Sequence, residues 1–145
     1  MDYVDTSALI KAYVVEAGTP EFVEWLASEG LPCVSELSVV EFRASVRRRE
    51  RTGELAGARV KAILGRFDRH LVDGTLERLS WPADAFAAAS RTIDHVAPLP
   101  LRTLDALHLA VARLRGCIGF ASADRNQLKA AHLLGLETHA FLHSS

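Results

Sequence analysis

Residues 1–9 read MDYVDTSAL, a very short apolar run that is followed at once by three polar residues. An apolar run that ends in helix-capping residues is typical of a buried strand leading directly into a helix. Two later apolar stretches, 31–34 and 117–121, are also followed by helical patterns. Short, wholly apolar strands separated by helices predict a parallel sheet with helices on both faces. We therefore predict one α/β domain over residues 1–145 with a short central parallel sheet.

The spacing of apolar residues divides the rest of the chain into further helices and strands. Within one predicted helix, Leu37, Val40 and Ala44 form an apolar stripe along one side. The predicted helices cover residues 8–15, 20–29, 35–51, 54–71, 83–96, 103–114 and 124–134. Two further strands are predicted over residues 76–79 and 137–141. No internal repeat or linker interrupts this pattern, so we expect the elements to form one unit.

The composition is that of a globular protein, with 145 residues of which 49% are hydrophobic and 24% charged. A chain of this length buries roughly 70% of its unfolded surface. Cys33 and Cys117 lie far apart in the sequence without metal-ligand spacing, which argues against a zinc site or a disulfide scaffold. No apolar run reaches about 20 residues, the length that crosses a bilayer, and the N-terminus lacks the features of a signal peptide. We expect a cytoplasmic protein that does not associate with membranes.

Four acidic residues occupy places where ligands bind in parallel α/β sheets, beyond the carboxyl ends of strands or at helix starts. Asp5 follows the first strand, Asp124 lies just after an apolar strand, and Asp105 opens a helix. Glu41 lies inside a helix beside apolar residues. Taken singly, each acid has a structural explanation. The three aspartates suit helix caps or first turns, and Glu41 suits an ion pair with nearby arginines.

Taken together, the four carboxylates indicate a metal site. A helix cap needs only a short polar residue, so Ser or Asn would serve as well, yet three helix starts carry a carboxylate. Carboxylates that meet in one pocket repel one another unless cations intervene, and Mg²⁺ and Mn²⁺ prefer oxygen ligands. Such a site suits the hydrolysis of phosphodiester bonds, because the metal activates water and stabilises the charged oxygens.

The motifs around these acids resemble those of PIN domains, in order and spacing, over nearly the whole chain. Residues 4–9 (VDTSAL) resemble the opening strand and turn of that family, and residues 38–42 (SVVEF) resemble the helix with its glutamate. Residues 104–110 (LDALHLA) and 121–128 (ASADRNQL) resemble its third and fourth acidic motifs. The length of the chain resembles the toxin half of a VapBC toxin–antitoxin pair.

This resemblance implies a metal-dependent endoribonuclease that uses Mg²⁺ or Mn²⁺ to cut RNA. It also implies a homodimer and a small antitoxin protein that holds the enzyme inactive. The metal-binding, catalytic acids would be Asp5, Glu41, Asp105 and Asp124. The supporting positions would be Thr6, Ser7, Ser122 and Asn126. Ser122 stands where many members carry threonine, and Asn126 stands where some carry a further aspartate, so we expect one firmly held ion.

Basic residues near Glu41 indicate where RNA would bind. The net charge is −1, but five arginines fall between positions 43 and 51 and create a local positive face. A solvated helix end and an antitoxin contact are the alternative interpretations of this cluster. His108 shares a helix face with Asp105, and we interpret it as a packed or hydrogen-bonded residue rather than a general base. The residues expected to contact RNA phosphates are Arg43, Arg47, Arg48 and Arg102.

Two other functions are open at this point. The first is a PIN-like module that binds RNA or protein without cleavage, although the presence of all four acids argues against a degenerate site. The second is a phosphoaspartate hydrolase, a class of enzyme that also begins with an aspartate after its first strand. Those enzymes use a second aspartate two residues later as acid and base, and this chain has Ser7 there.

Overall fold

Five short strands form one sheet in the order β3-β2-β1-β4-β5, and every strand pair is parallel. The structure is a computed structural model that describes residues 1–29 and 32–142. Leu31, which was included in a predicted strand, lies outside the described residues. The strands are β1 (Asp2–Val4), β2 (Pro32–Val34), β3 (Glu77–Arg78), β4 (Gly119–Ser122) and β5 (Glu137–Ala140).

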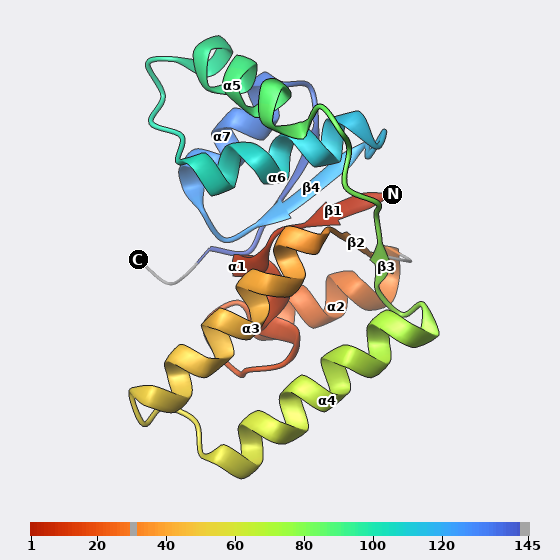
Figure 1. The fold of residues 1–145 in the computed structure, drawn as a ribbon, viewed down its shortest axis with the longest axis vertical. Helices are drawn as coiled ribbons and strands as arrows, with labels where there is room; N and C mark the ends of the chain where they lie inside the picture. Colours follow the sequence, from red (N-terminus) through yellow and green to blue (C-terminus); the bar gives the residue numbers. More distant parts are fainter. Residues whose placement is uncertain (30–31, 143–145) are drawn as a thin grey trace.

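Helices lie on both sides of this sheet, with α1 to α4 on one side and α5 to α7 on the other (Figure 1). This arrangement confirms the predicted α/β fold with a covered parallel sheet. The single helix predicted over residues 8–15 is instead a short α1 followed by the 3-10 turn η1 (Ile10–Ala12). The helices are α1 (Thr6–Leu9), α2 (Thr19–Glu29), α3 (Glu36–Arg51), α4 (Gly57–Asp73), α5 (Ala85–Val96), α6 (Thr103–Leu114) and α7 (Arg125–Leu133).

Alternate residues of the central strands fill two separate cores, because successive side chains of a strand point to opposite faces. One core receives Val4 and Val34 together with apolar residues of α1 to α4. The other receives Tyr3 and Phe120, which lie side by side in the β1–β4 register and pack against α5 to α7. Burial on both faces explains why these strands read as continuous apolar runs.

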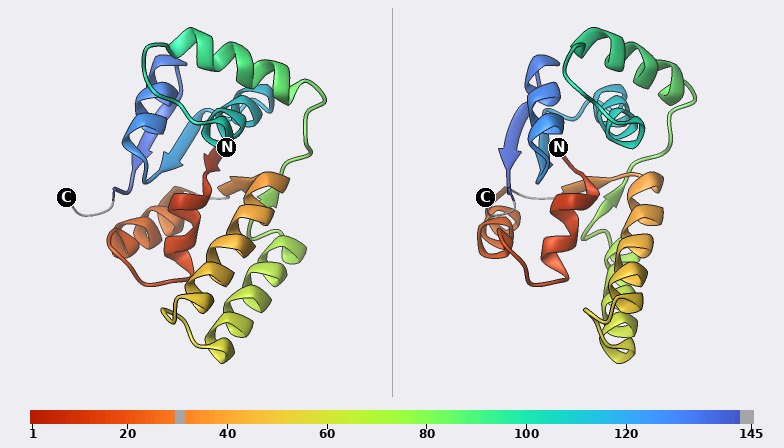
Figure 2. Two further views of the ribbon diagram at one scale, coloured as in Figure 1. Left: turned by 60° about the vertical axis from the view of Figure 1, so that its left-hand side comes forward. Right: turned by 90° about the vertical axis from the view of Figure 1, so that its left-hand side faces the viewer.

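The buried side of α3 is not the apolar stripe predicted from the sequence. Val40 is 66% exposed, whereas Phe42 and Val46 are fully buried. The Phe42 ring stacks on Phe67 of α4 with ring centroids 4.0 Å apart, and α3 and α4 lie side by side in both views of Figure 2. Both stripes have helical spacing, and the partner helix α4 decides which of them is buried.

The carboxyl ends of β1, β2 and β4 meet at one edge of the sheet, because neighbouring parallel strands run in the same direction. Helices α1, α3 and α7 begin within two or three residues of those ends. This edge therefore gathers three helix N-termini from distant parts of the chain. None of the described helices combines the length and the apolar character needed to cross a membrane.

Candidate active site

A cleft of about 530 Å³ opens at this edge, and all four predicted acids line it. Asp5 comes from the end of β1, Glu41 from α3, Asp105 from the first turn of α6 and Asp124 from the N-terminus of α7. The fold thus brings together side chains that are widely separated in the sequence. Further residues that line the cleft are Thr6, Ser7, Ser45, Arg48, Arg51, Arg102 and His108.

Asp5 is 3% exposed and is held by three donors. Its Oδ1 accepts hydrogen bonds from the Ser7 hydroxyl (2.8 Å) and the Ala8 N–H (3.1 Å), and the Ser122 hydroxyl donates to Oδ2 (2.9 Å). Burial raises the pKa of Asp5 to about 6, although these donors and His108 act in the opposite direction. Asp5 is therefore both the N-cap of α1 and the most deeply buried acid of the cleft.

Glu41 is held through one of its two carboxylate oxygens. The Thr6 hydroxyl lies 2.8 Å from Oε1, and His108 Nε2 contacts the same atom. Burial acts to raise the pKa of Glu41, but the hydrogen bonds from His108 and Thr6 outweigh it, so the pKa lies below its ordinary value. Among the described residues no donor contacts Oε2, so this oxygen is available to a ligand in the cleft.

Asp105 and Asp124 are joined by one arginine. Arg102 Nε lies 3.0 Å from Asp105 Oδ2, and its Nη2 lies 3.3 Å from Asp124 Oδ2. The other oxygen of Asp124 caps α7 by accepting the Gln127 N–H at 2.9 Å. Burial raises the pKa of Asp105 even though Arg102 opposes the shift. Arg102 itself is 79% exposed and therefore reaches the two acids from the solvent side.

The supporting hydroxyls connect the acids to the backbone. The Ser7 hydroxyl accepts the Ala123 N–H (2.9 Å), and the Ser122 hydroxyl accepts the Asp124 N–H (3.0 Å). Gln127 is fully buried, with its Oε1 2.9 Å from Ser122 Oγ. These contacts fix α1 against the start of α7.

The predicted arginines are divided between two environments. Arg43 pairs with Asp68 of α4 at 2.6 Å, and Arg47 pairs with Glu50 at 2.9 Å, so neither lines the cleft. Arg48 and Arg51 do line it, and no ion pair is formed by either among residues 1–29 and 32–142. Arg51 was not singled out from the sequence, where nothing distinguishes it from its neighbours. Asn126 is exposed and lies outside the cleft lining.

The acids do not form a ready-made metal cage. Within the described parts of the chain, no three Asp, Glu, His or Cys side chains converge tightly enough to hold an ion as they stand. At least one oxygen of each acid is turned toward a hydroxyl, imidazole or guanidinium donor instead. The donor set nevertheless fits a hard divalent cation, because four carboxylates share one cleft and a cationic guanidinium already bridges two of them.

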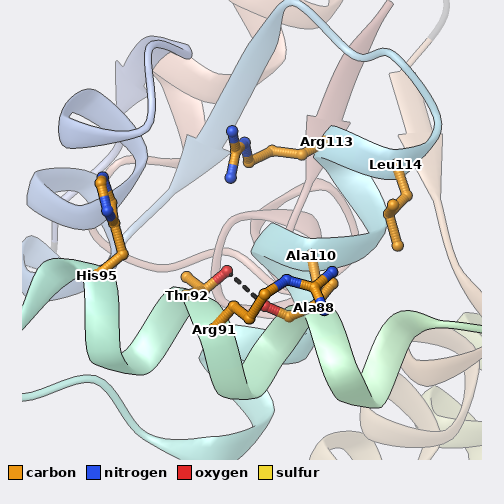
Figure 3. A pocket seen from close by; sticks show the side chains of 7 residues that line it. All are labelled: Ala88, Arg91, Thr92, His95, Ala110, Arg113 and Leu114. Carbon is orange, nitrogen blue, oxygen red and sulfur yellow. Dashed lines mark hydrogen bonds between the residues drawn. The ribbon is translucent and has the colours of Figure 1, made fainter.

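A second hollow of about 470 Å³ lies between α5 and α6. Figure 3 shows Arg91 and His95 extending from α5 and Arg113 extending from α6. Thr92, on its floor, donates a hydrogen bond to the Ala88 carbonyl within the same helix (2.9 Å). Among the residues that the structure describes, no carboxylate lines this hollow, so the candidate metal chemistry belongs to the cleft at the sheet edge.

Comparisons with known proteins identify the family. The PIN domain family model matches residues 3–133. Ribonuclease VapC35 of Mycobacterium tuberculosis is 32% identical over 143 residues, which cover 94% of this chain and 93% of the relative.

Two solved structures share the fold at low sequence identity. The first is VapC20 of Mycobacterium tuberculosis, described as a toxin that cleaves the sarcin–ricin loop, with 17% identity, a TM-score of 0.72 and coverage of 94% of this chain and 99% of that one. The second is VapBC2 of Rickettsia felis bound to a promoter DNA fragment, with 14% identity, a TM-score of 0.67 and coverage of 97% and 98%. These likenesses show the fold alone. The family model and the 32% identical relative show that the chain belongs to the PIN-domain family.

Proposed function

We propose that the chain is a divalent-metal-dependent endoribonuclease that acts as the toxin of a type II toxin–antitoxin pair. The observation that carries this proposal is the meeting of four carboxylates in one cleft of a chain related to VapC ribonucleases. PIN-domain ribonucleases generally use a divalent metal. We infer Mg²⁺ or Mn²⁺ here because the donors are carboxylate oxygens, which suit hard cations.

Asp5, Glu41, Asp105 and Asp124 would hold the ion. When bound, it supplies an activated water and stabilises charge on the phosphodiester oxygens. The chain's own contribution is to hold the acids: Ser7 and Ser122 orient Asp5, and Thr6 orients Glu41. We propose one resting ion, because Asn126 adds no carboxylate to the cleft.

RNA would approach along one side of α3. Glu41, Ser45, Arg48 and Arg51 follow one another at intervals of three or four residues and all line the cleft. Ten residues of helix extend about 15 Å. We propose that Arg48 and Arg51 bind RNA phosphates along this path and that Arg102 binds phosphate beside the acids.

The arginines of α3 provide a matched test of this RNA path. We expect the Arg48→Ala/Arg51→Ala double variant to raise KM for a single-stranded RNA and to lower the salt slope of binding by about 0.7 per lost contact. The Arg43→Ala/Arg47→Ala variant removes the same charge from the same helix outside the cleft and serves as the control. Equal effects of the two variants on the salt slope would contradict the proposed path.

We also propose a small antitoxin protein as partner, because the related VapBC2 structure is a complex of this kind, and a homodimer acting on RNA in the cytoplasm. Co-expression of this chain with the product of a short adjacent reading frame should yield a stable complex. Purification of the chain alone under those conditions would contradict the pairing.

Cleavage of RNA by the purified chain tests the central proposal. We expect cleavage of a structured RNA with Mg²⁺ or Mn²⁺, none with EDTA, and none by Asp5→Asn. Asp68→Asn, an exposed acid paired with Arg43 outside the cleft, serves as the control. RNA binding without cleavage under any metal would favour a non-catalytic binding module instead.

A further inference from the structure

A buried chain of hydrogen bonds runs from the sheet to Glu41 behind the cleft. The Tyr3 hydroxyl lies 2.7 Å from Ser35 Oγ and 2.6 Å from His108 Nδ1. On its other side, His108 Nε2 contacts Glu41 Oε1. Tyr3, Ser35 and His108 are all buried, so water does not compete for the contacts among these three residues.

The chemistry of the groups fixes the direction of the contact between His108 and Glu41. Ionised Glu41 can only accept, so His108 Nε2 must carry the hydrogen. In its neutral form the imidazole accepts at Nδ1, so the Tyr3 hydroxyl donates to it and in turn accepts from Ser35; a protonated ring would donate to the Tyr3 oxygen instead. In both cases every member has a partner, and the two contacts hold the His108 ring in one orientation.

Each member of the array is also fixed by packing or by a second hydrogen bond. The Tyr3 ring stacks on Phe120 with centroids 5.5 Å apart and meets the His108 ring edge-on at 5.6 Å. The Ser35 N–H donates to Ser38 Oγ at 3.1 Å, at the start of the helix that carries Glu41. The array therefore joins β1, α3 and α6 into one frame around a single carboxylate oxygen.

We propose that His108 and Tyr3 are positioning residues that hold Glu41 by Oε1 and thereby present Oε2 to the metal. This proposal rests on the proposed metal-dependent function, and it concerns residues that contact a metal ligand without contacting the metal. Residues that hydrogen-bond to a metal ligand from behind contribute about 10- to 100-fold to metal affinity or activity. A merely packed histidine would contribute to stability alone.

The same chain contains a second tyrosine–histidine pair that serves as a control. The Tyr13 hydroxyl lies 2.6 Å from His70 Nδ1, the same separation as in the Tyr3–His108 pair. This pair joins the residue after η1 to α4 and lines a different hollow, without contact to an acid of the cleft. Tyr13→Phe retains the ring, which meets Phe42 of α3 edge-on, and removes only this hydrogen bond, so we expect it to change stability but not the hydrogen bonds of Glu41.

Mn²⁺ titration by calorimetry, without RNA, tests the proposal. We expect His108→Leu to weaken Mn²⁺ binding by about 10- to 100-fold. His108→Gln should restore most of the affinity, because its amide can donate to Glu41 and accept from Tyr3. Tyr3→Phe should weaken Mn²⁺ binding by about 2- to 10-fold. Tyr13→Phe should leave Mn²⁺ binding unchanged, although it should lower the Tm by about as much as Tyr3→Phe does.

Three results would overturn the positioning role: Mn²⁺ affinity unchanged in folded His108→Leu, affinity of His108→Gln as low as that of His108→Leu, or equal affinities of Tyr3→Phe and Tyr13→Phe. Tyr3→Phe removes a single oxygen and retains the ring, so the test stands even where His108→Leu does not fold. A wild-type chain that binds Mn²⁺ but cleaves no RNA would refute the ribonuclease function and leave the positioning role intact.

Discussion

The four acids of the cleft are held in two different ways. Asp5 and Glu41, the scaffold-held pair, accept hydrogen bonds from buried or partly buried hydroxyls, a backbone N–H and an imidazole. Asp105 and Asp124, the arginine-held pair, share the exposed guanidinium of Arg102. The first pair is therefore held by the folded frame. The second is held on its solvent side by a side chain that can leave, although Asp124 also caps α7 through the Gln127 N–H.

The energies of the two kinds of contact explain the difference. Polar contacts in a buried, low-dielectric setting are strong, and an unpaired partner left behind is costly. An exposed ion pair typically contributes about 0–1 kcal/mol. Displacement of Arg102 by a metal ion or a phosphate therefore costs little, whereas movement of Asp5 would break several buried contacts.

The largest expected effect separates the two pairs by cleavage rate. Asp5→Asn should lower the single-turnover rate by more than about 100-fold, beyond the range typical of residues behind a ligand. Asp124→Asn should lower it by only about 10-fold, because an amide oxygen still caps α7 and the lost charge lies nearer to solvent. The rates are measured on one RNA at saturating Mn²⁺. Equal losses in the two variants would remove the distinction between the pairs.

Stability should respond to Asp5 in the opposite sense from activity. The pKa of Asp5 is about 6 in the folded protein and 3.8 as its ordinary value. Between these values the folded state binds a proton that the unfolded state has lost, so stability falls as the pH rises from about 4 to 6. Asp5→Asn should therefore raise the free energy of unfolding by up to about 3 kcal/mol at pH 7.5.

Urea unfolding in EDTA at pH 7.5 and 4.5 measures this effect. The gain should shrink at pH 4.5, where folded Asp5 is protonated. Glu41→Gln is the matched comparison and should lose stability at pH 7.5, because the folded protein lowers the pKa of Glu41 and so favours its charge. A gain from Asp5→Asn that is the same at both pH values would show that burial of charge is not its cause.

The meeting of the acids followed from the sequence, but the way they are held did not. Asp5 and Asp124 follow apolar runs, and the carboxyl ends of adjacent parallel strands coincide, so their proximity is a consequence of the strand pattern. Asp105 was placed at a helix start and Glu41 inside a helix, and the resemblance to known motifs supported their assignment to the same site. The bond from Tyr3 to His108 spans 105 residues of sequence, and no local spacing predicts a contact of that kind.

The arginines of α3 also show that local spacing in the sequence does not predict contacts between distant residues. Arg43, Arg47, Arg48 and Arg51 are one cluster in the sequence, and helical spacing alone does not say which of them is free. Arg43 forms an ion pair with Asp68 on the neighbouring helix, and Arg47 forms one with Glu50. Since the packing of α3 against α4 also decided which apolar stripe was buried, the same helix pair fixes both the core side and the cleft side of α3.

The smallest expected effect concerns the arginine-held pair directly. Arg102→Ala removes the positive charge that pairs with both Asp105 and Asp124. Because this exposed ion pair competes with the metal ion for the two acids, we expect Mn²⁺ to bind about 2- to 5-fold more tightly. Calorimetric titration without RNA measures this, and Arg43→Ala, which breaks the ion pair with Asp68, is the control. Weaker Mn²⁺ binding in Arg102→Ala would mean that Arg102 arranges the acids for the metal, and the two pairs would then be equally part of the folded frame.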